Sequence, residues 1–259
     1  MDGVVAAIAR IAATGSPLVV VHGGGKEIDA ALATAGVEKR QVEGLRITDE
    51  ATLEIVVAVL AGAVNTRFVA ALLTAGTQAV GLTGADGACA LSAVAPPHRT
   101  VDGSAVDLGR VGLPSPNADM RLLRTLLDDG FVPVVASIGV DSEGRLLNVN
   151  ADTMAGHLAG RLRARRLVIA GSTAGVLDAA GRTIPLLDPV AIGELVSGGT
   201  ATAGMIAKLR ACEQALAGGV DDVVIVDGRD KDALQAAASG PGVVPRAGTR
   251  VITTVGTRP

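Results

Sequence analysis

The amino-acid sequence predicts an α/β fold with a mainly parallel central sheet, and three observations support this prediction. Short runs of β-branched and aliphatic residues, such as residues 18–21, show no polar alternation, which is typical of strands buried on both faces. Between these runs lie longer segments whose apolar residues recur at helical spacing. Glycine-containing turns follow several of the strands, as is common where a parallel strand leads into a helix.

The composition limits both the core and the classes of function. Of the 259 residues, 49% are hydrophobic but only 1% are aromatic, so the core must be largely aliphatic. So few aromatic side chains, together with a net charge of −3, argue against nucleic-acid binding. Cys89 and Cys212 cannot form a disulfide framework, and the three histidines show no metal-ligand spacing. Because we find neither an apolar run of ~18 residues nor a signal peptide, we expect a cytoplasmic protein with no membrane partner.

Helices and strands are expected to alternate along the N-terminal part of the chain. Glycine, proline and polar residues mark where each element ends, and Thr48 or Asp49 can cap the longest helix. Two turn-forming pairs, at residues 96–97 and 102–103, divide residues 89–111 into hairpins. We expect helices at residues 2–13, 26–35, 50–74 and 117–129, and strands at residues 18–21, 78–82 and 132–137.

The C-terminal part continues the same alternation. A helix follows Asp152, and a later helix, at residues 205–217, carries Lys208 in its first turn. A further helix is expected at residues 189–196, and strands at residues 167–170, 222–226 and 248–253. Since we find neither an internal repeat nor a linker, we expect one continuous α/β unit.

The turn after the first strand is the strongest candidate for an anion-binding site. Gly23, Gly24 and Gly25 separate that strand from a helix, so backbone N–H groups and the positive end of the helix dipole face outward. The turn does not match a Walker loop, because Glu27 follows Lys26 where a hydroxyl is required. Nor does it match the dinucleotide fingerprint, because Ile28 occupies the third glycine position. A tight strand-to-helix connection without a ligand is the alternative interpretation.

Other polar residues are also candidates for a binding site. Arg46 lies in an apolar approach to a helix cap and suits a carboxylate, although a surface arginine is the alternative. Asn148 and Asn150 share one face of an extended segment that leads to Asp152, and helix capping is the alternative interpretation for them. Lys208, near a helix N-terminus, opposes the helix dipole unless an anion binds there.

Several segments, in order along nearly the whole chain, resemble the amino acid kinase family, and within it the acetylglutamate kinases. They are residues 22–25, 44–48, 81–87, 133–139, 148–152, 175–178, 204–208 and 226–229. The resemblance implies a three-layer αβα sandwich with one continuous sheet. Its N-terminal lobe, residues 1–166, would bind the amino-acid substrate and form a homodimer, and residues 167–259 would bind ATP.

The reaction implied by this resemblance is transfer of the γ-phosphoryl group of ATP to the side-chain carboxylate of N-acetyl-L-glutamate, in arginine biosynthesis. Gly24, Asp152 and Lys208 would be catalytic. Magnesium would be held through the nucleotide phosphates. The substrate would be bound by Gly24, Gly25, Arg46, Asn148 and Asn150. The nucleotide would be lined by Ser172, Thr173, Ala174, Gly175, Val176, Leu177, Thr200, Ala201 and Thr202.

Two departures from the family pattern keep other functions open. Ser172 stands where the family usually has aspartate, and no Lys-x-Gly-Gly strand is found before residue 18. We therefore expect this chain to be a poor kinase as it stands. The alternatives are a binding protein for acetylglutamate or a nucleotide that lacks catalysis, and a sister kinase for another amino-acid carboxylate.

Overall fold

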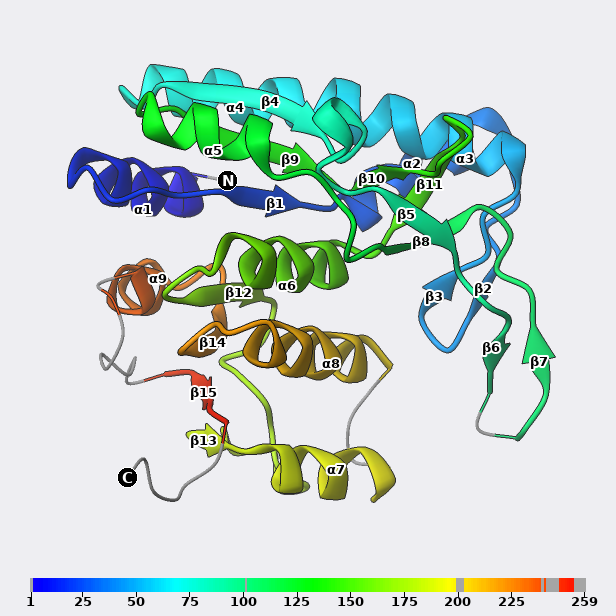
Figure 1. The fold of residues 1–259 in the computed structure, drawn as a ribbon. Coiled ribbons are helices and arrows are strands. Elements are labelled where there is room, and N and C mark those ends of the chain that lie inside the picture. The colour runs from blue at the N-terminus through cyan, green and yellow to red at the C-terminus, as the bar shows by residue number, and fades with distance from the viewer. Residues whose placement is uncertain (1, 101, 199–202, 239, 241–246, 254–259) are drawn as a thin grey trace. The chain divides into compact units, whose positions relative to one another are not determined.

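A computed structural model of the protein describes residues 2–100, 102–198, 203–238, 240 and 247–253. The chain divides into two compact units. The N-terminal unit is residues 15–154, and the C-terminal unit is residues 155–259 together with residues 1–14. This division differs from the expected boundary at 166/167. Helix α1 (Asp2–Ala13) packs on α9 (Lys231–Ala238), which places the first residues of the chain in the C-terminal unit (Figure 1).

The N-terminal unit is built on a three-stranded parallel sheet in the order β1-β9-β4. All residues of the central strand β9 are buried, as the absence of polar alternation predicted. The register aligns His22, Thr83 and Ala136 at the carboxyl ends of the strands, so these ends share one edge of the sheet. The strands are β1 (Val20–His22), β4 (Ala79–Thr83) and β9 (Val132–Ala136).

The long helix expected at residues 50–74 is confirmed, with one unforeseen feature. Asp49 caps it, accepting a hydrogen bond from the Thr52 backbone N–H at 2.9 Å. In its middle, the segment η1 is a π-helix, which widens the turn and shifts the register of the residues that follow. The helix consists of α3 (Glu50–Val57), η1 (Ala58–Val64) and α4 (Asn65–Thr74); the unit also contains α2 (Gly25–Ala35), α5 (Arg121–Asp128) and the 3-10 turn η2 (Asp86–Ala88).

The same helix corrects the expectation that no segment could span a membrane. By length and composition, Glu50–Thr74 is the one helix in the described part of the chain that is long and apolar enough to do so. One face of it, however, is buried in the unit through residues such as Val56, Leu60 and Leu72. Helices that cover the core of soluble proteins pass the same test, so this finding is weak evidence for membrane insertion.

A second sheet of the N-terminal unit has mixed strand directions and the order β10-β11-β8-β5. Two small hairpins, β2–β3 and β6–β7, accompany it, and the hairpins expected within residues 89–111 are confirmed (Figure 1). The strands are β5 (Ser92–Val94), β8 (Val111–Pro114), β10 (Ile138–Val140) and β11 (Leu146–Val149), with β2 (Gln41–Val42), β3 (Leu45–Arg46), β6 (His98–Arg99) and β7 (Ala105–Val106).

The C-terminal unit has its own sheet, in the order β12-β14-β15-β13, so the described strands do not form the single continuous sheet that was expected. β12 and β14 are parallel and in register from Leu167 opposite Val223 to Gly171 opposite Asp227, whereas β15 is antiparallel to β14. The strands are β12 (Leu167–Gly171), β13 (Leu186–Leu187), β14 (Val223–Asp227) and β15 (Thr249–Val251). The remaining helices are α6 (Ala151–Leu162), which begins in the N-terminal unit, α7 (Pro189–Ser197) and α8 (Ala203–Ala217).

Candidate functional site

The glycine turn occupies the position that the sequence predicted, between β1 and α2. The Gly24 carbonyl accepts the first helical hydrogen bond, from the Ile28 N–H at 2.9 Å. A Cβ atom added to Gly24 would lie only 2.9 Å from Leu60 Cδ2, so a larger residue would disturb the packing on η1. A Cβ atom at Gly25 would meet nothing within 4 Å. The turn therefore lies between a packed helix and open space, with the N-terminus of α2 available to an anion.

Arg46 lies against α2, on strand β3. Its Nη2 atom donates to Asp29 Oδ1 at 2.5 Å, and Asp29 is on α2 one turn beyond Gly25. Partial burial opposes ionisation of Asp29, but hydrogen bonds from Lys39 and Arg46 outweigh it and lower the pKa of that carboxyl. The Arg46 side chain is only 10% exposed, and its Nη1 atom is buried with no partner among the described residues. One side of this guanidinium thus lacks an acceptor among the described residues.

Asn148, which is 100 positions from Thr48 in the chain, lies beside the same segment. Its Nδ2 atom donates to Thr48 Oγ1 at 3.0 Å, and the fully buried Thr48 donates from the same hydroxyl to the Arg46 carbonyl at 3.4 Å. Strand β11 holds Asn148 opposite Ile138 and Val111. The structure therefore brings Arg46 and Asn148 together through one hydroxyl group.

Asn150 and Asp152 lie at the start of α6. Asn150 Oδ1 accepts a hydrogen bond from the Thr153 N–H at 3.1 Å, so this side chain caps the helix, in agreement with the capping alternative. Asp152 lies in the first turn of the same helix. The Cβ atom of Ala151 is 3.3 Å from the position that a Cβ atom on Gly23 would take. The N-termini of α2 and α6 are therefore adjacent, and both favour negative charge.

The C-terminal unit gathers charged groups at the carboxyl ends of β12 and β14. The Cε atom of Lys208 is 3.7 Å from the position of a Cβ atom on Gly171, which ends β12. Arg229 forms an ion pair with Asp227, and its Nη2 atom donates to the Ser172 carbonyl at 2.8 Å. The hydrogen bond from Arg229 is the main reason why the pKa of Asp227 falls to about 2. Ligands of parallel α/β sheets commonly bind at this edge.

One detail of Lys208 differs from the sequence prediction. Helix α8 begins at Ala203, two residues earlier than expected, so Lys208 lies in its second turn. The effect of the helix dipole falls off beyond the first turn. The dipole therefore gives less reason to expect an anion beside Lys208 than the predicted helix start did. The proximity to Gly171 now supports the site instead.

The loop after β12 contains six of the nine residues predicted to line the nucleotide. Thr173 Oγ1 donates to the Gly175 carbonyl at 2.9 Å, and the Val176 N–H donates to Thr249 Oγ1 at 2.7 Å. The Val176 side chain is 1% exposed and belongs to the core, so only its backbone could contact a ligand, whereas Leu177 is 36% exposed. Thr200, Ala201 and Thr202 lie outside the described residues.

Two residues beside the glycine turn, His22 and Asn65, were given no functional role from the sequence. Both are buried, and the Asn65 Nδ2 atom is 3.0 Å from His22 Nε2. His22 belongs to the family-like segment at residues 22–25, but its side chain was assigned no role there. Asn65, inside a long apolar helix, could have been noticed only as a buried polar residue that needs partners.

The fold agrees with the comparisons to known proteins. The sequence profile of the amino acid kinase family matches residues 1–227, and the chain belongs to this family. Within the family the chain is similar to proteins named acetylglutamate kinase. The protein of that name from Rhizorhabdus wittichii is 44% identical over 231 residues, which are 88% of this chain and 76% of the relative. The one from Afipia carboxidovorans is 42% identical over 221 residues, 83% of this chain and 74% of the relative.

Solved structures confirm the α/β class. The crystal structure of smu.665 from Streptococcus mutans UA159 has a TM-score of 0.80 and 25% identity, and covers 96% of this chain and 91% of its own. N-acetylglutamate synthase from Neisseria gonorrhoeae, complexed with coenzyme A and N-acetyl-glutamate, has a TM-score of 0.79 and 25% identity, over 98% of this chain and 56% of that one. Carbamate kinase from Giardia lamblia bound to AMP-PNP, at 16% identity and a TM-score of 0.64, shares the fold over 97% of this chain and 89% of its own.

Proposed function

We propose that this protein transfers the γ-phosphoryl group of ATP to the side-chain carboxylate of N-acetyl-L-glutamate, in arginine biosynthesis. The observation that carries the proposal is the buried guanidinium of Arg46, half paired with Asp29 and half without a partner among the described residues. A buried charged N–H donor without an acceptor is costly, and a ligand carboxylate is an acceptor that removes that cost. The relatives named acetylglutamate kinase support the choice of substrate.

The chemistry requires positioning and charge neutralisation rather than a covalent intermediate. A side-chain carboxylate oxygen of the substrate forms a bond to the γ-phosphorus while the bond from that phosphorus to the β,γ-bridging oxygen breaks, and ADP leaves. We propose that Arg46 and Asn148 hold the substrate, and that the N–H groups of Gly24 and Gly25 face the phosphoryl group. Asn150 supports this site by capping α6.

The residues proposed to bind ATP lie in the C-terminal unit: Lys208 would stabilise the phosphoryl group in transfer, and residues 172–177 with 200–202 would line the nucleotide. Asp152, at the start of α6 in the N-terminal unit, would have an orienting role. The placement of Lys208 beside Gly171, at the carboxyl edge of the sheet, supports this arrangement. Magnesium would enter with ATP, bound through its phosphates. The described residues contain no group of three or more His, Cys, Asp and Glu side chains that could hold a metal ion.

The resemblance to the family also implies a cytoplasmic homodimer without nucleic-acid or membrane partners, and we include this in the proposal. In the N-terminal unit, β4 is at one edge of its sheet, which is a position where a second copy could continue the ladder. Size-exclusion chromatography with light scattering measures the mass directly. A single mass near the 25.7 kDa of the chain would contradict the dimer.

The proposed reaction is tested by incubating the protein with Mg-ATP and N-acetyl-L-glutamate and trapping the acyl phosphate with hydroxylamine. N-acetyl-aspartate and free glutamate serve as competing acceptors that probe a sister activity. We expect ADP release that depends on N-acetyl-L-glutamate. Binding of N-acetyl-L-glutamate by calorimetry without any turnover would instead support the binding-protein alternative.

Arg46→Ala should raise the KM for N-acetyl-L-glutamate roughly 30- to 1,000-fold, equivalent to about 2–4 kcal/mol, because a charge-assisted bidentate contact is lost. The KM for ATP should change little. Arg121→Ala is the matched control, because the Arg121 side chain is 88% exposed and forms its ion pair with the neighbouring Asp119. An unchanged KM for the acceptor in Arg46→Ala would refute the assigned role.

A further inference from the structure

We infer that His22 and Asn65 form a positioning relay that fixes the Gly23–Gly24 peptide so that the Gly24 N–H faces the bound anion. The inference rests on the proposed function in one respect, namely that the glycine turn is the anion site. Neither residue would touch the substrate; both would act through the backbone of the turn.

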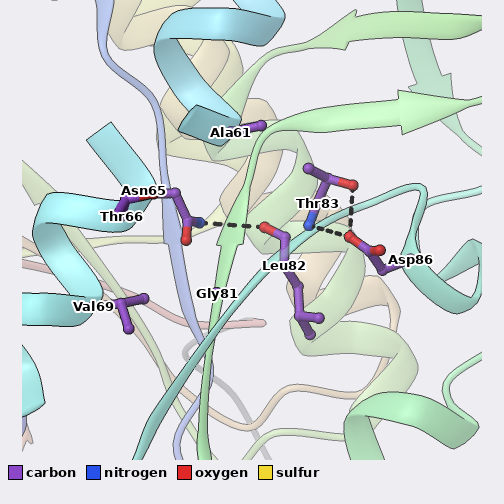
Figure 2. A pocket seen from close by; sticks show the side chains of 8 residues that line it. All are labelled: Ala61, Asn65, Thr66, Val69, Gly81, Leu82, Thr83 and Asp86. Atoms are coloured by element: carbon purple, nitrogen blue, oxygen red, sulfur yellow. Dashed lines mark hydrogen bonds between the residues drawn. The ribbon is translucent and has the colours of Figure 1, made fainter. Parts of the chain in front are cut away.

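The Asn65 amide has a defined orientation. Its Nδ2 atom is 2.9 Å from the Val134 carbonyl and 3.3 Å from the Leu82 carbonyl, so it faces two acceptors from neighbouring strands. Figure 2 shows the Asn65 side chain extending from its helix toward Leu82. Because carbonyl oxygens only accept hydrogen bonds, the NH₂ group, and not the amide oxygen, must point into this space.

The contacts of its two ring nitrogens fix the tautomer of His22. The same Nδ2 atom of Asn65 is 3.0 Å from His22 Nε2, and an amide nitrogen can only donate. The two hydrogens of the NH₂ group are therefore shared among three acceptors, the longest contact being the one to the Leu82 carbonyl, and Nε2 accepts and carries no proton. In a neutral imidazole the proton is then on Nδ1, which is 3.1 Å from the Gly23 carbonyl and donates to it.

Peptide geometry then determines the direction of the Gly24 N–H. In a planar trans peptide the C=O and the next N–H point in opposite directions. A Gly23 carbonyl held by the His22 ring therefore turns the Gly24 N–H away from that ring. No acceptor for this N–H is found within the described part of the chain, and Gly24 immediately precedes the first residue of α2. The relay thus prepares a backbone donor at the helix N-terminus before any ligand binds.

The surroundings hold the relay in place. His22 is 9% exposed and Asn65 4% exposed, and the edge of the Phe68 ring packs near the His22 ring at a centroid distance of 6.1 Å. A Cβ atom on Gly81 would lie 2.2 Å from Asn65 Oδ1, so β4 leaves room for the amide only because residue 81 is glycine. Burial lowers the pKa of His22, although the Gly23 carbonyl and Glu27 act in the opposite direction, so the neutral ring is favoured.

The tautomer is tested first, by ¹⁵N NMR of protein labelled at its three histidines. We expect one neutral ring protonated at Nδ1 near pH 7.5, and its signals should disappear in His22→Leu. This measurement does not depend on catalysis, so it tests the relay even if the wild-type protein shows no kinase activity. A His22 ring protonated at Nε2 would overturn the inference.

Kinetics then separate positioning from a purely structural role. His22→Leu should lower kcat roughly 10- to 100-fold, somewhat less than the about 10²–10³ lost when a preorganised donor is removed outright. His22→Asn should recover most of the loss, because its amide nitrogen can reach the Gly23 carbonyl from nearly the position of Nδ1. His98→Leu, in the β6–β7 hairpin, is the matched control. Equal kcat losses in His22→Leu and His22→Asn, or no loss in either, would overturn the relay.

Discussion

At the scale of single residues, the proposed roles of Arg46 and Lys208 rest on different observations. Arg46 is buried, with one nitrogen paired and one unpaired, and this points to a ligand on geometric grounds. Lys208 is supported by its place beside Gly171, at the carboxyl edge of the sheet where ligands of such folds commonly bind. The helix dipole gives it less support, since α8 starts earlier than the sequence indicated. The two residues also differ in the step they would affect, since a substrate clamp acts in the ground state and a phosphoryl cation acts mainly in the transition state.

Lys208→Ala should therefore reduce kcat by about 10²–10³ while the KM for ATP changes less than about tenfold. Lys208→Arg should restore activity only in part, because a planar fork cannot take the place of a compact ammonium. Steady-state kinetics with both substrates varied measure this split. Lys231→Ala, which changes a lysine at the start of α9, is the control. A Lys208→Ala enzyme with the wild-type kcat would remove this lysine from the mechanism.

At the scale of elements, the π-helical segment η1 links the long helix to both the glycine turn and the sheet. Leu60 and Val64 of η1 pack beneath Gly24, and Asn65, the next residue, reaches three strands through its amide. An α-helical path through the same residues would rotate Asn65 away from one of these contacts, since its side chain would shift in register by one residue. The π-helical turn thus allows one helix both to pack against the glycine turn and to place Asn65 in contact with the three strands.

Gly81→Ala should destabilise the N-terminal unit by about 1–3 kcal/mol, because the new methyl group would overlap Asn65 Oδ1 in a buried place. Gly62→Ala is the matched control: a Cβ atom there meets nothing within 4 Å, and the change should be neutral or stabilising by ~0.5–1 kcal/mol. Urea titration followed by circular dichroism compares the two variants. Equal stability would show that Asn65 moves aside freely, and that would also weaken the relay.

At the scale of the whole molecule, two units with separate sheets and cores share one chain. Their stabilities need not be equal, so unfolding need not follow a single transition. The C-terminal unit contains His157, which is 5% exposed and whose Nε2 atom has no partner among the described residues. Burial, with a smaller effect from Arg161, lowers the pKa of His157 from 6.5 to about 4. That shift makes the stability of this unit depend on pH.

Above pH 6.5 the His157 ring is neutral in both states and contributes no pH dependence. As the pH falls from 6.5 toward 4, the unfolded chain binds a proton that the folded chain does not, so stability decreases, by about 2 kcal/mol at pH 5. Urea midpoints at pH 8 and pH 5 measure the loss by circular dichroism, since the chain has no Trp or Tyr. His157→Leu should show a smaller loss, with a remainder from His22, whose pKa is also lowered by burial. The same loss in both proteins would contradict the assignment to His157.

The sequence by itself determined the α/β class, the order of most elements, and the glycine turn. The signals for these features are local: an unbroken apolar run, helical periodicity and the conformational freedom of glycine can all be read from neighbouring residues. The long helix at residues 50–74 and its cap at Asp49 were predicted for the same reason. Residue-by-residue roles of Arg46, Asn148, Asp152 and Lys208 came from the resemblance to a family and stay predictions.

Only the tertiary structure decided which distant residues meet. Arg46 and Asn148 share the hydroxyl of Thr48, and Asn65 joins the His22 ring to strands β4 and β9. The tertiary structure also places α1 in the C-terminal unit and shows several separate sheets in place of the single expected one. Such contacts depend on how elements pack after long loops have closed, and no local propensity encodes them. The polar contacts around the glycine turn are of this kind, because a buried donor takes whichever acceptors the packing of the strands brings within reach.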